Sequence, residues 1–275
     1  MEKICSDLDE EHKELDGLVA GLDEITWHIK TPFFKWTIFD EVAHIAFFDQ
    51  EALLAVEDPV GFKTCSEKVM EIVTSPDPWP EQFNQMLEPK TPDDLLLYWR
   101  RTRTRLLQHL RTMMPGDRVP WYGPDMSARS FATARLMETW AHSQDIFDTL
   151  RKKRKNTKRL HHLAHIGVNT FGWSFKVRGV TVPSIIPRVE LSAPDGEQWV
   201  WGKPEAENRV WGSAQDFCLV VTQRRNLADT RLKWQGEHAG KWLSLAQAFA
   251  GIPQDPPIPG ARVIDDENLR EHRGH

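Results

Sequence analysis

The spacing of apolar residues changes once along this chain of 275 residues, and that change constrains the fold more than any other feature. Up to about residue 178, apolar residues recur every three or four positions, which is the period of an amphipathic helix. Helices are expected near residues 2–22, 38–56, 92–113, 127–150 and 157–177. Prolines and glycines lie between these segments, and Ser127 is a suitable N-cap for the fourth. The first part of the chain is therefore predicted to be a helical bundle.

The stretch 182-VPSIIPRVELSAPDGEQWVWG-202 alternates with period two around a Pro-Asp-Gly turn. This pattern predicts a hairpin that pairs Arg188–Ser192 with Glu197–Trp201. Helices are expected to follow near residues 213–224 and 239–250. The fold class is thus mainly α, with an antiparallel four-helix bundle followed by a small α+β module. The expected divisions are residues 1–178 for the bundle, 179–252 for the module and 253–275 for a mobile tail.

Composition excludes several classes of protein. The net charge is only −5 and both signs are mixed along the chain, so no global field favours nucleic acid or an anionic membrane. The three cysteines, Cys5, Cys65 and Cys218, are far apart and suggest a reducing compartment. The first residues are acidic where a signal peptide would be basic, and no run approaches the roughly 20 apolar residues of a membrane span. We expect a cytoplasmic protein with a small-molecule partner, and a homodimer is compatible with this composition.

The stretch 136-LMETWAHSQD-145 carries the clearest chemical signal. Glu138 and His142 are four residues apart, so on a helix both side chains point the same way and could share a metal ion. Zinc and related ions accept imidazole nitrogen and carboxylate oxygen, and catalytic sites commonly have three protein ligands. His44 is the best third candidate, because the helix predicted for 36-WTIFDEVAHIAFFDQ-50 is apolar almost all round and would be buried.

The spacing alone leaves a second interpretation open. On the helix predicted for residues 127–150, Glu138, His142 and Asp145 lie roughly opposite the apolar arc, which is also typical of a solvated face. A single histidine such as His44 on a buried helix is often a hydrogen-bonded core residue. From spacing alone, His44, Glu138 and His142 are therefore either metal ligands or ordinary surface and core residues.

The two motifs 36-WTIFDEVAHIA-46 and 136-LMETWAHSQDIFD-148 together resemble those of the DinB-like four-helix proteins. The resemblance is greatest to the N-terminal domain of mycothiol-dependent maleylpyruvate isomerases, and it covers roughly residues 1–178. It implies that His44, Glu138 and His142 bind a divalent metal, generally zinc. Two histidines and a glutamate also suit nickel, iron or manganese.

The second half of the chain is similar to the small C-terminal α+β domain of the same isomerases. In that family the helix that matches 213-SAQDFCLVVTQRR-225 commonly ends in Gly-Arg, whereas this sequence has Gln-Arg-Arg. Arg224 and Arg225 are therefore candidates to hold an acidic substrate through paired hydrogen bonds.

Four other residues are candidates to line the site. Arg135 lies one turn before Glu138, and Trp121 and Tyr122 belong to an aromatic loop that directly precedes the ligand-bearing helix. In 161-HHLAH-165 three histidines are spaced as on a helix, and His165 is the one that could line the site. Packing in loops and core would produce the same pattern. The basic run 151-RKKRKNTKR-159 could attract phosphates, although cations also suit the carbonyl end of a helix.

Three classes of function follow from this sequence. In the first, a bound ion lowers the pKa of a low-molecular-weight thiol, so that the protein is a thiol-dependent transferase or isomerase acting on a small electrophilic, acidic substrate. In the second, the protein is a metal-dependent hydrolase with Asp145 or Asp49 as the base. In the third, it binds a metal or ligand without catalysis. The family resemblance favours the first class.

Overall fold

The computed structural model describes residues 1–74 and 79–262, and the chain divides into two compact units. The first unit comprises Met1–Ile146 and Phe249–Ile252. The second comprises Phe147–Ala248 and the chain from Pro253 onward. The division lies earlier than the expected boundary at residue 178, because the helices that follow residue 159 pack within the second unit.

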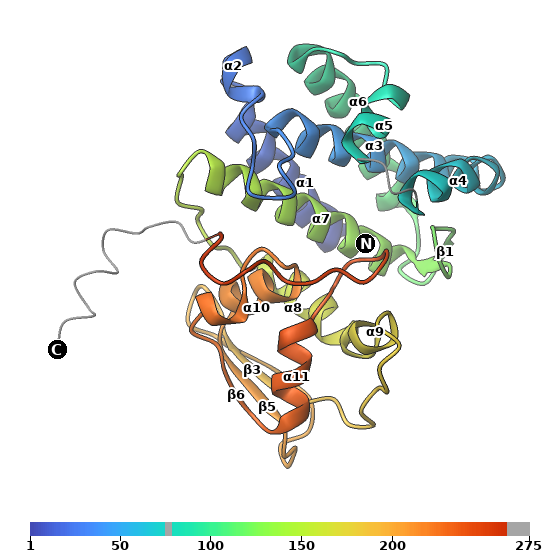
Figure 1. Ribbon diagram of the computed structural model, residues 1–275. Coiled ribbons are helices and arrows are strands. Elements are labelled where there is room, and N and C mark those ends of the chain that lie inside the picture. The colour runs from blue at the N-terminus through green and yellow to red at the C-terminus, as the bar shows by residue number, and fades with distance from the viewer. Residues whose placement is uncertain (75–78, 263–275) are drawn as a thin grey trace. The chain divides into compact units, whose positions relative to one another are not determined.

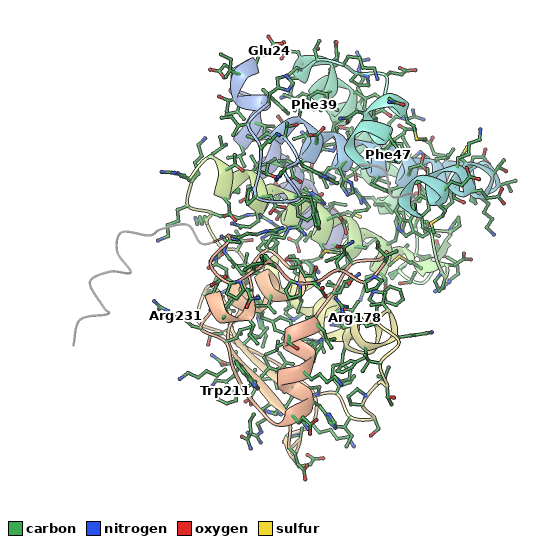
Figure 2. All side chains as sticks on the ribbon, in the orientation of Figure 1. Glu24, Phe39, Phe47, Arg178, Trp211 and Arg231 are labelled. Carbon is green, nitrogen blue, oxygen red and sulfur yellow. The ribbon has the colours of Figure 1, made fainter. Side chains whose placement is uncertain are left out.

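The first unit is helical, with long helices that account for most of its residues (Figure 1). Its elements are α1 (Glu2–Val19), α2 (Glu24–Trp27), α3 (Ile38–Glu57), α4 (Pro59–Thr74), α5 (Trp79–Met86), α6 (Pro92–Thr112), β1 (Arg118–Val119), β2 (Met126–Ser127) and α7 (Ala128–Thr149). Helix α3 packs against α4, α5 and α6, and α1 packs against α6. Phe47 of α3, labelled in Figure 2, is one of the buried apolar side chains of this unit. The four long helices α1, α3, α6 and α7 confirm the predicted bundle.

Polar caps set where the long helices begin. The Thr37 hydroxyl accepts a hydrogen bond from the backbone N–H of Asp40, and the Asp40 carboxylate accepts one from the backbone N–H of Thr37. This reciprocal capping box satisfies two amides at the start of α3. Thr91 caps α6 in the same position, with Pro92 at the first helical residue. Ser127 accepts from the backbone N–H of Ser130 and confirms the expected cap of α7.

A buried polar cluster joins the four long helices. Asp49 of α3 accepts hydrogen bonds from Trp99 Nε1 of α6 at 2.8 Å and from Arg135 Nε of α7 at 3.0 Å. His12 Nε2 of α1 lies 3.4 Å from the same carboxylate. Burial alone would raise the pKa of Asp49, but the charges of Arg135 and His12 outweigh burial and hold that pKa far below its usual value. The carboxylate is therefore ionised in the middle of the bundle.

Helices α4 and α5 were not predicted from the sequence. Both pack against α3, and α4 also packs against α5. Short helices gain most of their stability from such tertiary packing, so the local pattern alone is a poor guide to them. The predicted long helices, by contrast, agree with α1, α3, α6 and α7 to within a few residues.

The second unit is a small α+β module (Figure 1). Its elements are α8 (Leu160–Asn169), α9 (Phe171–Lys176), β3 (Arg188–Ser192), β4 (Gln198–Trp201), β5 (Arg209–Ser213), α10 (Ala214–Val221), the 3₁₀ turn η1 (Leu227–Asp229), β6 (Lys233–Gln235) and α11 (Glu237–Leu245). The strand order is β4-β3-β5-β6, and β3 pairs parallel to β5 but antiparallel to β4. Helix α8 packs on α10, and α11 packs on α9.

The predicted hairpin is confirmed, since Ser192 pairs with Gln198 and Val189 with Trp201. The helix expected over residues 157–177 is interrupted at Thr170, whose non-helical backbone separates α8 from α9. Strands β5 and β6 were not predicted. Each is short, and β5 enters the sheet parallel to β3, a pairing that depends on residues distant in sequence.

The segment expected to be a mobile tail is only partly described. Residues 253–262 make specific contacts, because Gln223 and Asn226 donate side-chain hydrogen bonds to the carbonyls of Gln254 and Pro257 at 2.7 and 2.8 Å. Gly260 N–H donates to Asp229. The remainder of the expected tail, residues 263–275, lies outside the described residues.

Across residues 1–74 and 79–262, no helix combines the length and the apolar character that a bilayer span requires.

Replacing Asp49 by Asn tests the buried cluster. The Asp49→Asn variant should lose about 3–5 kcal/mol of unfolding free energy at neutral pH, because Arg135 would remain buried without its counter-ion. Urea denaturation measures this loss. The control is Glu57→Ala, which breaks an exposed pair with Arg105 and should cost about 1 kcal/mol or less.

Because folding lowers the pKa of Asp49, its stabilising contribution is present above the unfolded value near 3.8 and is lost as the pH falls toward the folded value. The difference between wild type and Asp49→Asn should therefore shrink in acid. An equal loss in the Asp49 and Glu57 variants would contradict a central role for this cluster.

Candidate metal centre

Helices α3 and α7 bring together the three residues that the motifs singled out. His44 Nε2 lies 3.6 Å from Glu138 Oε2, and His142 Nε2 lies 3.5 Å from the same oxygen. One donor atom from each of the three residues falls within 4.8 Å of the others. Tetrahedral ligands with bonds near 2.1 Å are separated by about 3.4 Å, so this spacing fits a common ion. Two imidazoles and one carboxylate are also a donor set that divalent transition metals accept.

Burial at these residues differs from that of a solvated helix face. The side chain of His142 is 4% exposed and that of His44 is 11% exposed, whereas that of Glu138 is 23% exposed. Asp145, one turn beyond His142, is fully buried. The interpretation of this face of α7 as solvent-exposed surface is therefore wrong, because the helix is enclosed on that side as well. Glu138 is the most accessible of the three candidate ligands.

The two histidines hold Glu138 in its ionised form. Burial alone would raise the pKa of Glu138, but hydrogen bonds and charges from His142 and His44 outweigh burial and keep it well below its usual value. A deprotonated carboxylate is the form that binds a cation.

Aromatic rings surround the two histidines. The Trp36 ring stacks on His142 with centroids 5.8 Å apart and an interplanar angle of 15°, and Phe33 meets the edge of His142 at 5.3 Å. Trp36 and Phe48 also contact His44, at 5.3 and 4.7 Å. These rings restrict both imidazoles and make the surroundings of the site apolar on several sides.

The rings of Phe33 and Trp36 come from one tight turn. The backbone N–H of Trp36 donates to the carbonyl of Phe33 at 2.9 Å, and the two residues between them, Phe34 and Lys35, have φ of 47° and 62°. Left-handed backbone at two consecutive residues other than glycine is unfavourable. The packing of this turn against the candidate ligands is one interaction that can offset that cost.

The sequence pattern did not single out Glu41, which contacts His142, or Thr31, which contacts Glu41. Glu41 of α3 is fully buried, and its Oε2 lies 2.5 Å from His142 Nδ1. The Thr31 hydroxyl donates to Glu41 Oε1 at 2.7 Å. The available signal was a charged residue in an otherwise apolar helix, three residues before His44 and hence on a similar face. Glu41, His142 and Asp145 also form a second group of donor atoms within 4.8 Å.

The other candidates from the first unit have definite positions. Asp49 and Arg135, predicted as a base and a substrate cation, are paired with each other in the buried cluster. The ring centroids of Trp121 and Tyr122 lie 6.3 and 5.8 Å from that of Phe48. Phe48 in turn contacts His44, so Phe48 lies between this loop and His44. Trp121 also stacks on Phe62 of α4 with an interplanar angle of 2°.

The remaining candidates belong to the second unit. Arg225 makes a paired ion contact with Asp148, at 2.6 and 3.0 Å, and both side chains are nearly buried. Arg224 is buried and donates to the carbonyl of Thr222 at 2.9 Å. His165 accepts from Trp201 Nε1 at 3.4 Å, and its pKa is lowered by burial and by the neighbouring His162.

Comparison with known proteins agrees with this architecture. The family model described as the mycothiol maleylpyruvate isomerase N-terminal domain matches residues 8–147. Two uncharacterised proteins of Mycobacterium tuberculosis, from strains CDC 1551 and H37Rv, are each 43% identical over 250 residues, which covers 91% of this chain and 96% of theirs.

Solved structures share the fold. Crystal structures of the mycothiol-dependent maleylpyruvate isomerase and of a mutant of it match with a TM-score of 0.51, at 16% and 14% identity, over 80% of this chain and 87% of theirs. The fold is thus that of these isomerase structures, a helical bundle followed by a small α+β module. The chain belongs to the mycothiol maleylpyruvate isomerase N-terminal domain family.

Glu51, another buried carboxylate on α3, gives a pH-dependent test of this region. Burial raises the pKa of Glu51 above its usual 4.5, while the hydrogen bond from Tyr122, at 2.6 Å, acts in the opposite direction. A raised pKa stabilises the fold fully below the unfolded value, and this contribution is lost as the pH rises through the folded value. The neutral Glu51→Gln variant should therefore gain unfolding free energy relative to wild type, on the order of 1 kcal/mol, as the pH rises above 4.5.

Chemical denaturation across that pH range measures the difference. Tyr122→Phe should steepen the loss of stability with rising pH, because it removes the hydrogen bond that favours the ionised form of Glu51. A difference between wild type and Glu51→Gln that stays constant with pH would contradict this account.

Proposed function

We propose that His44, Glu138 and His142 bind one divalent ion, zinc by preference, and that the protein is a thiol-dependent transferase or isomerase acting on a small electrophile. The single observation that carries the proposal is the convergence of two Nε2 atoms on one carboxylate oxygen at 3.5 and 3.6 Å. The chain belongs to a family named after mycothiol maleylpyruvate isomerase. We therefore expect its co-substrate to be a low-molecular-weight thiol such as mycothiol.

When bound, the ion would supply an open coordination position at which a thiol loses its proton near neutral pH. The residues of the chain define the surroundings of that position. Phe33, Trp36 and Phe48 cover the histidines and exclude water from that side. The Glu138 side chain is the most exposed of the three, so a thiol would approach the ion from the side of Glu138.

The hydrolytic alternative requires a general base near the ion. Asp49 accepts from Arg135 and Trp99 in the buried cluster, and Asp145 is fully buried. Asp145 has a donor atom within 4.8 Å of one on His142, but like Asp49 it is closed off from solvent. The geometry therefore favours thiol chemistry over hydrolysis.

The charge of the electrophile is a separate question. Arg135 and Arg225, both predicted as cations for an acidic substrate, are each held in a buried ion pair, with Asp49 and Asp148 respectively. Releasing either one would leave a buried carboxylate without its counter-ion, at a cost of about 3–5 kcal/mol. Neither arginine is therefore available to hold an acidic group, and the proposed substrate is a small electrophile.

Metal content tests the ligand assignment. Wild-type protein purified without chelators should hold one ion per chain, and His44→Ala should lose it while remaining folded, because the bundle is stabilised by its apolar faces. Elemental analysis and circular dichroism measure the two properties. His109→Ala is a matched control, since His109 is exposed and pairs with Glu57. Equal metal content in wild type and His44→Ala would exclude His44 as a ligand.

Cobalt substitution tests the thiol. A thiolate bound to cobalt absorbs strongly in the near ultraviolet, so titrating cobalt-substituted protein with mycothiol should produce a new absorption band. The His142→Ala variant should show none, because it lacks one of the three ligands. If the wild-type spectrum does not change with thiol while cobalt is bound, the thiol-dependent function is wrong and a non-catalytic metal-binding protein becomes the better description.

A further inference from the structure

Glu41 is a buried carboxylate whose position α3 does not require for its own folding. The neighbouring Asp40 already completes the capping box, and its other oxygen accepts from Asn84 Nδ2 at 2.6 Å. Glu41 itself is fully buried and contacts Thr31 and His142. Burying a carboxylate is costly unless its interactions compensate. The position of Glu41 is therefore best explained by what it does to those two residues.

The contact with His142 selects one tautomer of the imidazole. An ionised carboxylate only accepts hydrogen bonds, so with Glu41 ionised the 2.5 Å contact between its Oε2 and His142 Nδ1 requires the ring proton to lie on Nδ1. The protonated ring carries a proton on both nitrogens, whereas the neutral ring keeps the one on Nδ1 and has its lone pair on Nε2. That nitrogen is the one that lies 3.5 Å from Glu138 Oε2, on the ring whose centroid is 4.4 Å from that of His44.

Thr31 orients Glu41 and connects it to the aromatic turn. The Thr31 hydroxyl donates to Glu41 Oε1 at 2.7 Å and accepts from the backbone N–H of Phe33 at 3.2 Å. The backbone N–H of Thr31 donates to the carbonyl of Trp36 at 2.6 Å. One chain of hydrogen bonds thus joins the base of the turn, the Glu41 carboxylate and the His142 imidazole, while Phe33 and Trp36 pack on the same imidazole.

We propose that Glu41 is a positioning residue that holds His142 in the tautomer with its proton on Nδ1, and that Thr31 orients Glu41 for this role. Outer carboxylates of this kind fix the orientation of a histidine ligand and increase its basicity, and losing one typically weakens metal binding about 10- to 100-fold. The metal-binding consequence rests on the proposed function. The tautomer does not, because it is a property of the metal-free chain.

The first test measures the tautomer in metal-free protein. Nitrogen-15 NMR of histidine-labelled chain, recorded at alkaline pH where imidazoles are neutral, distinguishes a proton on Nδ1 from one on Nε2. The His142 signal is assigned by its absence in His142→Ala. Wild type should have the proton on Nδ1. The Glu41→Gln variant should shift His142 toward the Nε2 form, because the amide group of glutamine can donate to Nδ1.

The second test measures zinc affinity by competition with a chromophoric chelator. Glu41→Gln should bind zinc about 10- to 100-fold more weakly than wild type. Thr31→Val, which removes one hydrogen bond to Glu41, should weaken binding about two- to tenfold. Glu51→Gln is the matched control, since it neutralises another buried α3 carboxylate that accepts from a hydroxyl but does not touch a candidate ligand. Its affinity should stay within about twofold of wild type.

Three results would overturn the role of Glu41: a wild-type His142 with its proton on Nε2, a Glu41→Gln affinity as close to wild type as that of the control, or two zinc ions bound per chain. The last result would make Glu41 a ligand itself, together with His142 and Asp145. Thermal unfolding of Glu41→Gln and Glu51→Gln shows whether a loss of affinity reflects a loss of folding. A wild-type chain that binds no zinc would exclude the proposed function alone, since the tautomer of His142 still decides whether Glu41 positions it.

Discussion

The ion pair between Asp49 and Arg135 is the interaction on which the rest of the first unit depends. Asp49 lies five residues after His44 on α3, and Arg135 lies three residues before Glu138 on α7. Each member is therefore about one helical turn from a candidate ligand. The pair is buried, and Trp99 and His12 contact the same carboxylate. The ion pair therefore fixes how α3 and α7 are positioned along their axes and rotated relative to each other. A slip of either helix by one residue would separate this pair and the candidate ligands together.

The candidate metal centre combines rigid and accessible elements. His142 is held on three sides, by Glu41 at Nδ1 and by the rings of Phe33 and Trp36. Glu138 is more exposed than either histidine, and its charge is maintained by them. A site that reacts with a small molecule needs both properties, since fixed ligands preserve the geometry and an open side admits the reactant.

The second unit differs in how its polar groups are used. Arg225 and Asp148 are paired in a nearly buried position, and Arg224 donates to a backbone carbonyl at the end of α10. These contacts stabilise the turn that follows α10 rather than present free cations to a ligand. Asp148 lies near the end of α7, and it belongs to the second unit, which begins at Phe147.

The sequence by itself determined the features that depend on neighbouring residues. The long helices, the cap at Ser127, the hairpin around 194-PDG-196 and the placement of Glu138 and His142 on one helix face all follow from local spacing and turn chemistry. Only the tertiary structure decided which distant groups meet. It paired Asp49 with Arg135, placed Glu41 against His142 and aligned β5 parallel to β3. Such pairings join residues tens of positions apart, and the energy of a buried charge depends on its partner in space, which no local pattern specifies.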